Sequence, residues 1–428
     1  MGENNLFIEE SNLFEKLCSQ NVLRIAFMMV EKNKGAPGID GITIKQFKNN
    51  IEKELNIIQE ELITWTYQPE PVRGIDIPKP AGGTRLLGIP CIRDRVVQAA
   101  MKLLLEPLFE PQFSNNSYGF RPGRNQQQAV KRAQMITRSG KEFIVDIDLE
   151  KFFDGIQHNK LISRMRENIK DTRILRLIGI MLRSGIMKDG LVKRTQEGTT
   201  QGSPLSPLLS NIVLDQLDKE LENRGLEFCR FADDCNIFVR TEKAARRVMQ
   251  TITKFIEKKL KLTVNKDKSK IARTNKVKFL GMTIVAMTLA ISQQSINAAM
   301  AKVKELTPRG TYMTLDKSID NINQWYMGWS AYYRMTQYPA QLMKIEAHIR
   351  RRIRSRIVDQ QKQKRNLANK LINRGVPSRL ANKTAYSHRG RWALSHTRAV
   401  ERAYPNKWFI EEMGLKIRSN EKHKHWFG

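Results

Sequence analysis

Apolar residues recur along this chain with two different periods, and the changes between them predict its secondary structure. A period near 3.6 residues is typical of an amphipathic helix, and alternation with period 2 is typical of a half-buried strand. Helical spacing covers the segments 51–65, 94–109 and 244–262. Apolar runs beside turn residues predict strands within 74–90, 141–156, 228–239 and 276–291. Helices predominate from about residue 295 onward, so we expect an α+β fold with a helical C-terminal region.

The chain is strongly basic, with 74 Lys and Arg residues against 43 Asp and Glu residues and a formal net charge of +31. The excess is densest at the C-terminal end, where residues 341–428 hold 22 basic and 6 acidic side chains. Basic side chains displace condensed counterions from phosphates, so a charge of this size indicates a nucleic-acid partner. It argues against an ordinary soluble domain that binds no polyanion.

Cysteine usage and hydropathy bear on the compartment. The four cysteines, Cys18, Cys91, Cys229 and Cys235, form no CxxC pair, which favours a reducing compartment and argues against a zinc ribbon. The first 16 residues lack the apolar core of a signal peptide. No apolar run approaches the roughly 20 residues that span a bilayer. We therefore expect a soluble, cytoplasmic protein without a membrane partner.

Candidate chemistry lies where aspartates interrupt apolar segments. Asp233 and Asp234 occupy the tip of the hairpin predicted in 228–239, where a solvated turn would also explain them. Asp148 interrupts an apolar strand, and Asp146 lies on the same strand face, so either fits a special role. A buried carboxylate costs several kcal/mol unless a cation or metal ion compensates it. A strand-end acid that reaches water is the alternative for Asp148.

Sequence blocks that follow one another in a fixed order indicate the family that this chain resembles. The blocks are NKGAPGIDG (33–41), IPKPAGGTRLLGIPCIRDRVVQ (77–98), SYGFRPGRN (117–125), VDIDLEKFFDGIQH (145–158), GTTQGSPLSPLLSNI (198–212), FADD (231–234), LTVNKDKSKI (262–271), FLGM (279–282) and YMGWSAYY (326–333). The chain resembles the group II intron-encoded reverse transcriptase/maturase family over nearly its whole length. No Cys/His constellation follows position 235, so we expect no zinc-type endonuclease domain, as in bacterial class C members.

The resemblance implies a right-hand polymerase with fingers, palm and thumb. Asp148 and Asp233 would bind two Mg²⁺ ions, with Mn²⁺ as the alternative, and Asp234 would be a weaker ligand. Two such ions stabilise the attacking and leaving oxygens of an in-line displacement. Lys268 would be the general acid for pyrophosphate, and its alternative is one more exposed lysine. The carboxylate cluster is then a metal site within a phosphate-binding cleft.

The resemblance also implies roles in nucleotide binding and nucleic-acid binding for residues at matching positions. Lys79 and Arg85 would grip the incoming triphosphate, unless they only flank a solvated hairpin. Phe153 would be the steric gate that excludes a 2′-hydroxyl, and Gln201 would contact the nucleotide or the template. The predicted nucleic-acid contacts are Lys34, Arg121, Arg124, Arg350, Arg351, Arg352 and Arg354. A solvated helix face is the alternative for the C-terminal arginines.

Four regions follow from the resemblance. They are an N-terminal extension with a lid loop (1–45), fingers and palm (46–290), a helical thumb/maturase domain (291–365) and a basic DNA-binding region (366–428). The chain departs from the family pattern at Thr200, where proline is usual, and at Phe231, where tyrosine is usual. The segment 358–370 lacks the usual tryptophan, which makes splicing activity a weaker expectation than polymerisation.

The expected function is RNA-directed DNA polymerisation, with a maturase role in splicing and mobility of a group II intron. The expected partners are an RNA template with a DNA or RNA primer, dNTPs, structured intron RNA and target DNA. A homodimer is compatible with the same expectation. Two alternatives remain: a free-standing relative used by the host in DNA repair, and an RNA-binding maturase whose polymerase site is inactive.

Overall fold

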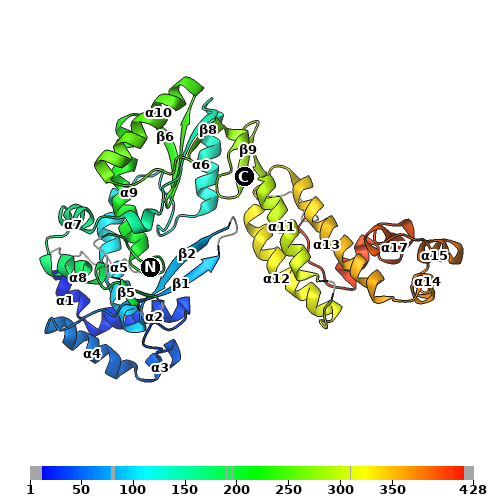
Figure 1. Ribbon diagram of the computed structural model, residues 1–428, viewed down its shortest axis with the longest axis horizontal. Coiled ribbons are helices and arrows are strands. Elements are labelled where there is room, and N and C mark those ends of the chain that lie inside the picture. Colours follow the sequence, from blue (N-terminus) through cyan, green and yellow to red (C-terminus); the bar gives the residue numbers. More distant parts are fainter. Residues whose placement is uncertain (1–11, 79–81, 189–190, 194–196, 309, 419–428) are drawn as a thin grey trace, which may run out of the picture. The chain divides into compact units, whose positions relative to one another are not determined.

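The computed structural model describes residues 12–78, 82–188, 191–193, 197–308 and 310–418. The chain forms two compact units, Met1–Arg273 and Thr274–Gly428 (Figure 1). The predicted α+β architecture is confirmed, because the first unit combines helices with two sheets and the second is mainly helical. No helix in the described part of the chain has both the length and the apolar character needed to cross a membrane.

The first unit begins with the helices α1 (Leu13–Leu17), α2 (Gln20–Asn33), α3 (Ile44–Asn49) and α4 (Ile51–Ile63), and the long buried helix α5 (Ile92–Phe109) follows them after the hairpin of β1 (Val72–Pro78) and β2 (Thr84–Ile89). Helices α1, α2 and α4 pack on α5, and α3 packs on α4. Helix α5 is buried along most of its length, and α2 lies against it. A side-chain cap fixes the start of α3, because Thr43 Oγ1 accepts the Gln46 N–H (3.3 Å) while Gln46 Oε1 accepts the Thr43 N–H (2.9 Å).

A four-stranded antiparallel sheet forms the centre of this unit. Its strands are β3 (Phe143–Ile147), β6 (Glu227–Phe231), β7 (Asp234–Val239) and β8 (Lys270–Arg273), in the order β6-β7-β3-β8. Figure 1 shows α6 (Gln126–Arg138), α9 (Ser206–Asn223) and α10 (Glu242–Phe255) around these strands. The apolar side chains of the strands and helices form one core. The hairpin predicted in 228–239 is confirmed as β6 and β7.

A second sheet has the order β2-β1-β4-β5. Its strands are β1 (Val72–Pro78), β2 (Thr84–Ile89), β4 (Ile186–Lys188) and β5 (Leu191–Lys193). The hairpin β1–β2 is antiparallel, and β4 joins β1 in parallel. Helices α7 (His158–Arg166) and α8 (Thr172–Leu182) pack on each other in the chain between β3 and β4.

The second unit has its own core. Its elements are β9 (Met282–Val285), β10 (Thr288–Ile291), α11 (Gln293–Leu306), α12 (Leu315–Tyr333), α13 (Pro339–Gln360), α14 (Lys364–Ile372), α15 (Ser378–Ala385), α16 (Arg391–Leu394), α17 (Arg398–Ala403) and α18 (Asn406–Glu411). A separate cluster of buried apolar residues runs from Ala299 to Leu415. The hairpin β9–β10 hydrogen-bonds within this unit, since the Ile291 N–H donates to Gln341 Oε1 (2.8 Å). The compact units therefore divide earlier than the boundary expected at residue 290.

All four cysteines are buried as free thiols in the first unit. Burial raises the pKa of Cys18 and of Cys91 to about 11. The pKa values of Cys229 and Cys235 are raised further by burial within the central sheet. Thiols of this kind act as small apolar side chains in the core.

Candidate active site

The central sheet brings the three predicted carboxylates to one end. Ile147 lies opposite Cys235 in the β3–β7 pairing, so the next register step places Asp148 beside Asp234. Phe231 pairs with Asp234, which leaves Ala232 and Asp233 as the two-residue turn between β6 and β7. Asp148 and Asp234, 86 positions apart in the sequence, thus lie at the end of two neighbouring strands.

The backbone of Asp148 is fixed by the loop that follows α10. Its N–H donates to Ser269 Oγ (3.0 Å), and its carbonyl accepts the Asn265 N–H (2.9 Å). The same loop places Lys268 Nζ 3.9 Å from Asp148 Oδ1. The predicted general acid and the predicted metal ligand are therefore neighbours, in a setting where about a third of the Asp148 side chain is exposed (36%).

The alternative aspartate, Asp146, lies deeper in the sheet. It pairs with Asn236 on one side and with Lys270 on the other. Burial raises the pKa of Asp146 to about 6, with Lys270 opposing that rise and Asp148 adding to it. A carboxyl in this position is less able than Asp148 to bind a ligand that enters from solvent.

A buried ion pair braces the turn that carries Asp233. Arg230 and Asp218 are both fully buried, and Arg230 Nη2 lies 2.5 Å from Asp218 Oδ2. Arg230 Nη1 also donates to the carbonyl of Ala232 (2.9 Å). Ala232 has a φ of +56°, an uncommon conformation for a residue with a side chain, so the hydrogen bond holds a strained turn in place.

The brace extends to the loop before α6. Arg230 Nη1 donates to Asn211 Oδ1 (3.1 Å), and Asn211 Nδ2 donates to the Gly119 carbonyl (2.9 Å). A Cβ on Gly119 would lie 2.2 Å from the Ala232 nitrogen, so only glycine allows this approach. No role was predicted for these residues from the sequence, although a charged residue inside an apolar strand was a signal for Arg230.

Phe153, Gln201 and Arg85, three of the predicted nucleotide-binding residues, lie on three segments joined by backbone hydrogen bonds. The Phe153 carbonyl accepts the Thr199 N–H (2.7 Å), and the Gln201 carbonyl accepts the Gly88 N–H of β2 (2.8 Å). Phe153 is half-buried against Phe152, with ring centroids 5.2 Å apart in an edge-on arrangement. Phe153 and Gln201 are thereby linked through one short loop and β2.

Of the two residues expected to grip the incoming triphosphate, the structure describes only Arg85. Arg85 is exposed on β2, opposite Ile77. Lys79 lies outside the described residues. Thr200, where the family usually has proline, packs so closely on β2 that a Cβ on Gly88 would lie 1.9 Å from Thr200 Cγ2.

Comparison with known proteins assigns two domains to the chain. Residues 77–284 match the family described as reverse transcriptase (RNA-dependent DNA polymerase), and residues 296–374 match the group II intron maturase-specific domain. Protein YkfC of Escherichia coli (strain K12) is 34% identical over 283 residues, which cover 57% of this chain and 74% of YkfC. The chain belongs to the group II intron-encoded reverse transcriptase/maturase family.

Other relatives of this reverse transcriptase/maturase match over shorter parts. The group II intron-encoded protein LtrA of Lactococcus lactis subsp. cremoris is 34% identical over 221 residues, or 51% of this chain and 37% of LtrA. Among solved structures, a partial Cas6-RT-Cas1--Cas2 complex is 24% identical over 57% of this chain and 42% of that chain, with a TM-score of 0.37. Telomerase from Candida albicans is 13% identical over 68% of this chain and 62% of that chain, with a TM-score of 0.41.

The family settles the fold class and the enzyme class. The reverse transcriptase/maturase is an RNA-directed DNA polymerase with the fingers and palm of a right-hand polymerase and a helical, basic C-terminal region. Both were expected from the sequence blocks, and both are confirmed.

The carboxylates of the reverse transcriptase/maturase suit the divalent metal ions that this family uses. Asp148, Asp233 and Asp234 supply only hard oxygen donors, which Mg²⁺ prefers. Within the described residues, no three His, Cys, Asp or Glu side chains converge as a ready-made metal site. Mg²⁺ usually keeps several waters and takes substrate phosphates as ligands, so one or two carboxylates are enough to hold it.

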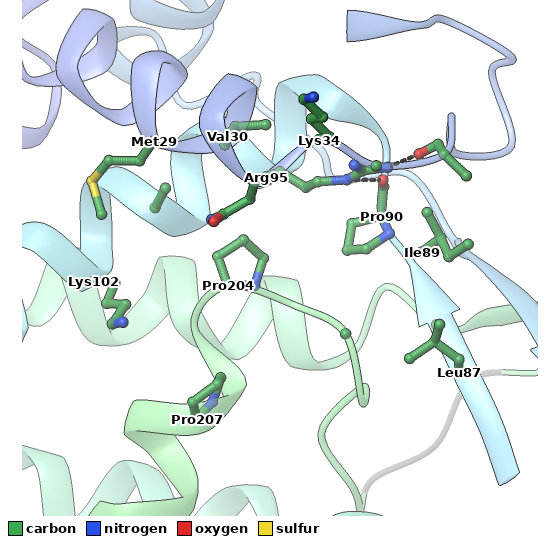
Figure 2. A pocket seen from close by; sticks show the side chains of 16 residues that line it. Met29, Val30, Lys34, Leu87, Ile89, Pro90, Arg95, Lys102, Pro204 and Pro207 are labelled. Carbon is green, nitrogen blue, oxygen red and sulfur yellow. Dashed lines mark hydrogen bonds between the residues drawn. The ribbon is translucent and has the colours of Figure 1, made fainter. Parts of the chain in front are cut away.

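A cavity of about 420 Å³ lies between α2, α5, β2 and the loop after Gln201 (Figure 2). Lys34 lines it, at the start of the predicted lid loop. Arg95 holds this loop, because its guanidinium donates to the carbonyls of Ala36 and Pro90. In Figure 2, Arg95 and Lys34 lie on the α2 side of the cavity and Pro204 lies across from them.

Two predicted nucleic-acid contacts in the fingers have different environments. Arg121 is 7% exposed and pairs with Glu110, with Nη2 2.8 Å from Oε1. Its guanidinium supports the fold, and the geometry gives no support to a nucleic-acid contact. Arg124 is half-buried, with its guanidinium 5.4 Å from the centroid of the Tyr118 ring and Nη1 donating to the Asn115 carbonyl (2.8 Å).

The four arginines of α13 that were predicted to contact nucleic acid also have different environments. Arg354 is 7% exposed and donates to the Tyr404 carbonyl (2.9 Å), so it ties α13 to the C-terminal helices. Arg352 donates to the carbonyl of Thr307 (2.6 Å). Arg350 and Arg351 are half-buried at the edge of a cavity in the second unit. Charge density predicted all four equally, because sequence alone does not reveal which cations the fold uses.

Proposed function

We propose that this chain extends a primer on an RNA template by two-metal-ion nucleotidyl transfer. The observation that carries the proposal is the meeting of Asp148, Asp233 and Asp234 at one end of the central sheet. Carboxylates carried by neighbouring strand ends repel one another, and cations bound between them would relieve that repulsion. A polymerase site gives that arrangement a function, and a solvated turn does not.

The residues around the carboxylates suit the steps of the reaction. The primer 3′-oxygen forms a bond to the α-phosphorus of the dNTP while the bond to pyrophosphate breaks. Divalent ions held by the carboxylates would stabilise the charge on these two oxygens. Lys268 Nζ would donate a proton to the leaving pyrophosphate oxygen, and its position near Asp148 supports this role. Phe153 would exclude a 2′-hydroxyl beneath the sugar.

Primer extension tests the proposal. Full-length wild type, Asp233→Ala/Asp234→Ala and the control Glu257→Gln, which removes an exposed carboxylate on another element, are compared on an RNA template with Mg²⁺ and dNTPs. We expect the double variant to lose extension by at least about a thousandfold and the control to match wild type. Extension by the double variant at the control rate would contradict the proposal.

We also propose that the second unit binds the RNA of a group II intron and assists its splicing. The match of residues 296–374 to the maturase-specific domain supports this role. Because that region contains none of the catalytic carboxylates, Asp233→Ala/Asp234→Ala should bind RNA as tightly as wild type. A gel-shift titration with the same template RNA measures it, and a parallel loss of binding and extension would contradict the separation of the two roles.

A further inference from the structure

The first residue of α7, His158, is a buried histidine that donates a hydrogen bond to a loop. Its side chain is 3% exposed, and Nε2 lies 2.7 Å from the carbonyl oxygen of Gly198. Burial lowers the pKa of His158 below its ordinary value of 6.5, so the ring is neutral at neutral pH. A carbonyl oxygen only accepts hydrogen bonds, so the single ring proton lies on Nε2 and is donated to Gly198.

This hydrogen bond accounts for a histidine at position 158 better than packing does. The other ring nitrogen, Nδ1, is buried and has no hydrogen-bond partner among the described residues. A buried polar atom without a partner costs free energy, and an apolar side chain of similar size would avoid that cost. The position therefore favours histidine because of what Nε2 holds.

Gly198 is held from both sides of its Cα atom. Its N–H donates to the Ile156 carbonyl (2.8 Å), while its own carbonyl accepts the hydrogen bond from His158. Gly198 has a φ of +96°, and a Cβ there would lie 3.1 Å from the carbonyl oxygen of Asp154. The loop thus lies closely against residues 153–158, in a conformation that suits glycine.

The loop formed by residues 198–201 connects this clamp to two of the predicted nucleotide-binding residues. The Thr199 N–H donates to the Phe153 carbonyl (2.7 Å), and the Gln201 carbonyl accepts the Gly88 N–H of β2 (2.8 Å). Phe153 belongs to the short 3-10 helix Phe152–Gly155. A single turn of this kind makes few hydrogen bonds of its own, so bonds from the loop contribute strongly to its position.

We propose that His158 is a positioning residue for sugar selection. By holding Gly198, it fixes the loop that sets the place of the Phe153 ring, and so determines how strongly a 2′-hydroxyl is excluded. The inference rests on the proposed polymerase function, with Phe153 as its steric gate. A gate works by direct contact, so a displacement of about 1 Å is enough to weaken it.

Single-nucleotide incorporation by the full-length protein on a primed RNA template tests the inference. The measured quantity is kcat/KM for a dNTP divided by kcat/KM for the matching rNTP, because this ratio reports discrimination. His158→Leu removes the donor, His158→Gln keeps an N–H donor, and Gly198→Ala strains the acceptor. Met165→Ala is the control for a general loss of stability, because Met165 is a fully buried apolar residue of the same helix.

We expect His158→Leu and Gly198→Ala to lower the ratio by about tenfold, and His158→Gln to restore most of it. Met165→Ala should lower the melting temperature and keep the wild-type ratio, which separates positioning from stability. A wild-type ratio in His158→Leu or Gly198→Ala, or an equal loss of discrimination in Met165→Ala, would overturn the inference.

Phe153→Ala distinguishes a failure of this inference from a failure of the proposed function. Absence of dNTP incorporation by the wild type would refute the polymerase, and an unchanged ratio in Phe153→Ala would refute the steric gate. The role of His158 falls in both cases. A lowered ratio in Phe153→Ala beside a wild-type ratio in His158→Leu would leave the gate in place and overturn only the role of His158.

Discussion

Arg230 shows how a single buried residue can brace the turn that carries Asp233, one of the carboxylates proposed to be catalytic. Its ion pair with Asp218 is fully removed from water, and its second contact is the carbonyl of the strained residue Ala232. Breaking a buried pair leaves an uncompensated charge, whereas replacing both partners with apolar residues often costs little stability. This difference allows the stability of the fold to be separated from the position of Asp233.

The single substitution Arg230→Met should lower the free energy of unfolding by about 3–5 kcal/mol, because Asp218 remains buried without a cation. The double substitution Arg230→Met/Asp218→Leu should recover most of that loss. It still lacks the hydrogen bond to Ala232, so kcat for primer extension should fall by roughly tenfold to a hundredfold with little change in KM for dNTP. Urea titrations and steady-state kinetics measure the two effects, and wild-type kcat in the double variant would refute the positioning role.

Gly119 makes a second prediction about the same turn. A Cβ there would lie 2.2 Å from the nitrogen and 2.9 Å from the Cα of Ala232, and backbone atoms cannot rotate away. Gly119→Ala should therefore displace the turn and reduce primer extension on the order of a hundredfold. Gly179→Ala is the matched control, because its Cβ meets only the flexible end of Arg183 at 3.3 Å. Equal extension by the two variants, with equal melting temperatures, would contradict the close contact.

At the residue scale, the three carboxylates could be identified from the sequence. An acid within an apolar segment loses hydration, which costs free energy unless a cation or metal ion compensates it. The sequence did not identify Asp218 or Asn211, which lie on a helix whose pairing with β6 is a tertiary property. It also treated Arg121 and Arg354 as surface cations, although both are buried and committed to partners in the fold. Composition gives the number of cationic side chains, and only the packing shows which of them are free to contact a ligand.

At the scale of elements, periodicity predicted whether a segment is a helix or a strand better than it predicted the compact unit in which that segment packs. The hairpin of β6 and β7 was expected within 228–239 and is present there. The strands β9 and β10 were also expected, but as part of the palm region ending at 290. In the structure β10 pairs with β9 and donates hydrogen bonds to Gln337 and Gln341 of the second unit. Strand propensity is local, whereas the choice of packing partner depends on residues about fifty positions away.

Helix α5 carries a buried acid in its first turn, and this gives a pH-dependent stability. Asp94 is 1% exposed and accepts hydrogen bonds from Tyr67 Oη (2.6 Å) and the Glu70 N–H (3.1 Å). Burial raises the pKa of Asp94 from 3.8 to about 6. The folded state thus holds this proton more tightly than the unfolded state, so the stabilisation is complete below pH 4 and is lost as the pH rises to about 6.

The loss should be on the order of 3 kcal/mol for the wild type, and Asp94→Asn should remove this part of the pH dependence. Urea-induced unfolding of the two proteins between pH 4 and pH 7 measures the difference in slope. Asp267→Asn, which replaces an exposed acid of the same unit, should behave as wild type. Parallel curves for wild type and Asp94→Asn would show that the burial of this carboxyl does not shift its proton affinity.

The described part of the chain contains two hydrophobic cores, one in each compact unit. One core runs through the central sheet and its helices, and the other joins helices α11 to α18. The carboxylates proposed to be catalytic belong to the first unit, whereas the residues that match the maturase-specific domain belong to the second. The proposed chemistry and the proposed RNA binding therefore depend on different cores, and a destabilising substitution in one should leave the other function measurable.

The burial of every thiol has a practical consequence for following this enzyme at work. Maleimides react with thiolates, and the raised pKa values keep all four side chains protonated and covered at neutral pH. Native wild type should take up almost no dye, and the urea-denatured chain should take up four. A single introduced cysteine, such as Lys383→Cys on the exposed face of α15, should then carry the only fluorophore. The four natural cysteines therefore need not be removed before a single fluorophore is attached to an introduced cysteine.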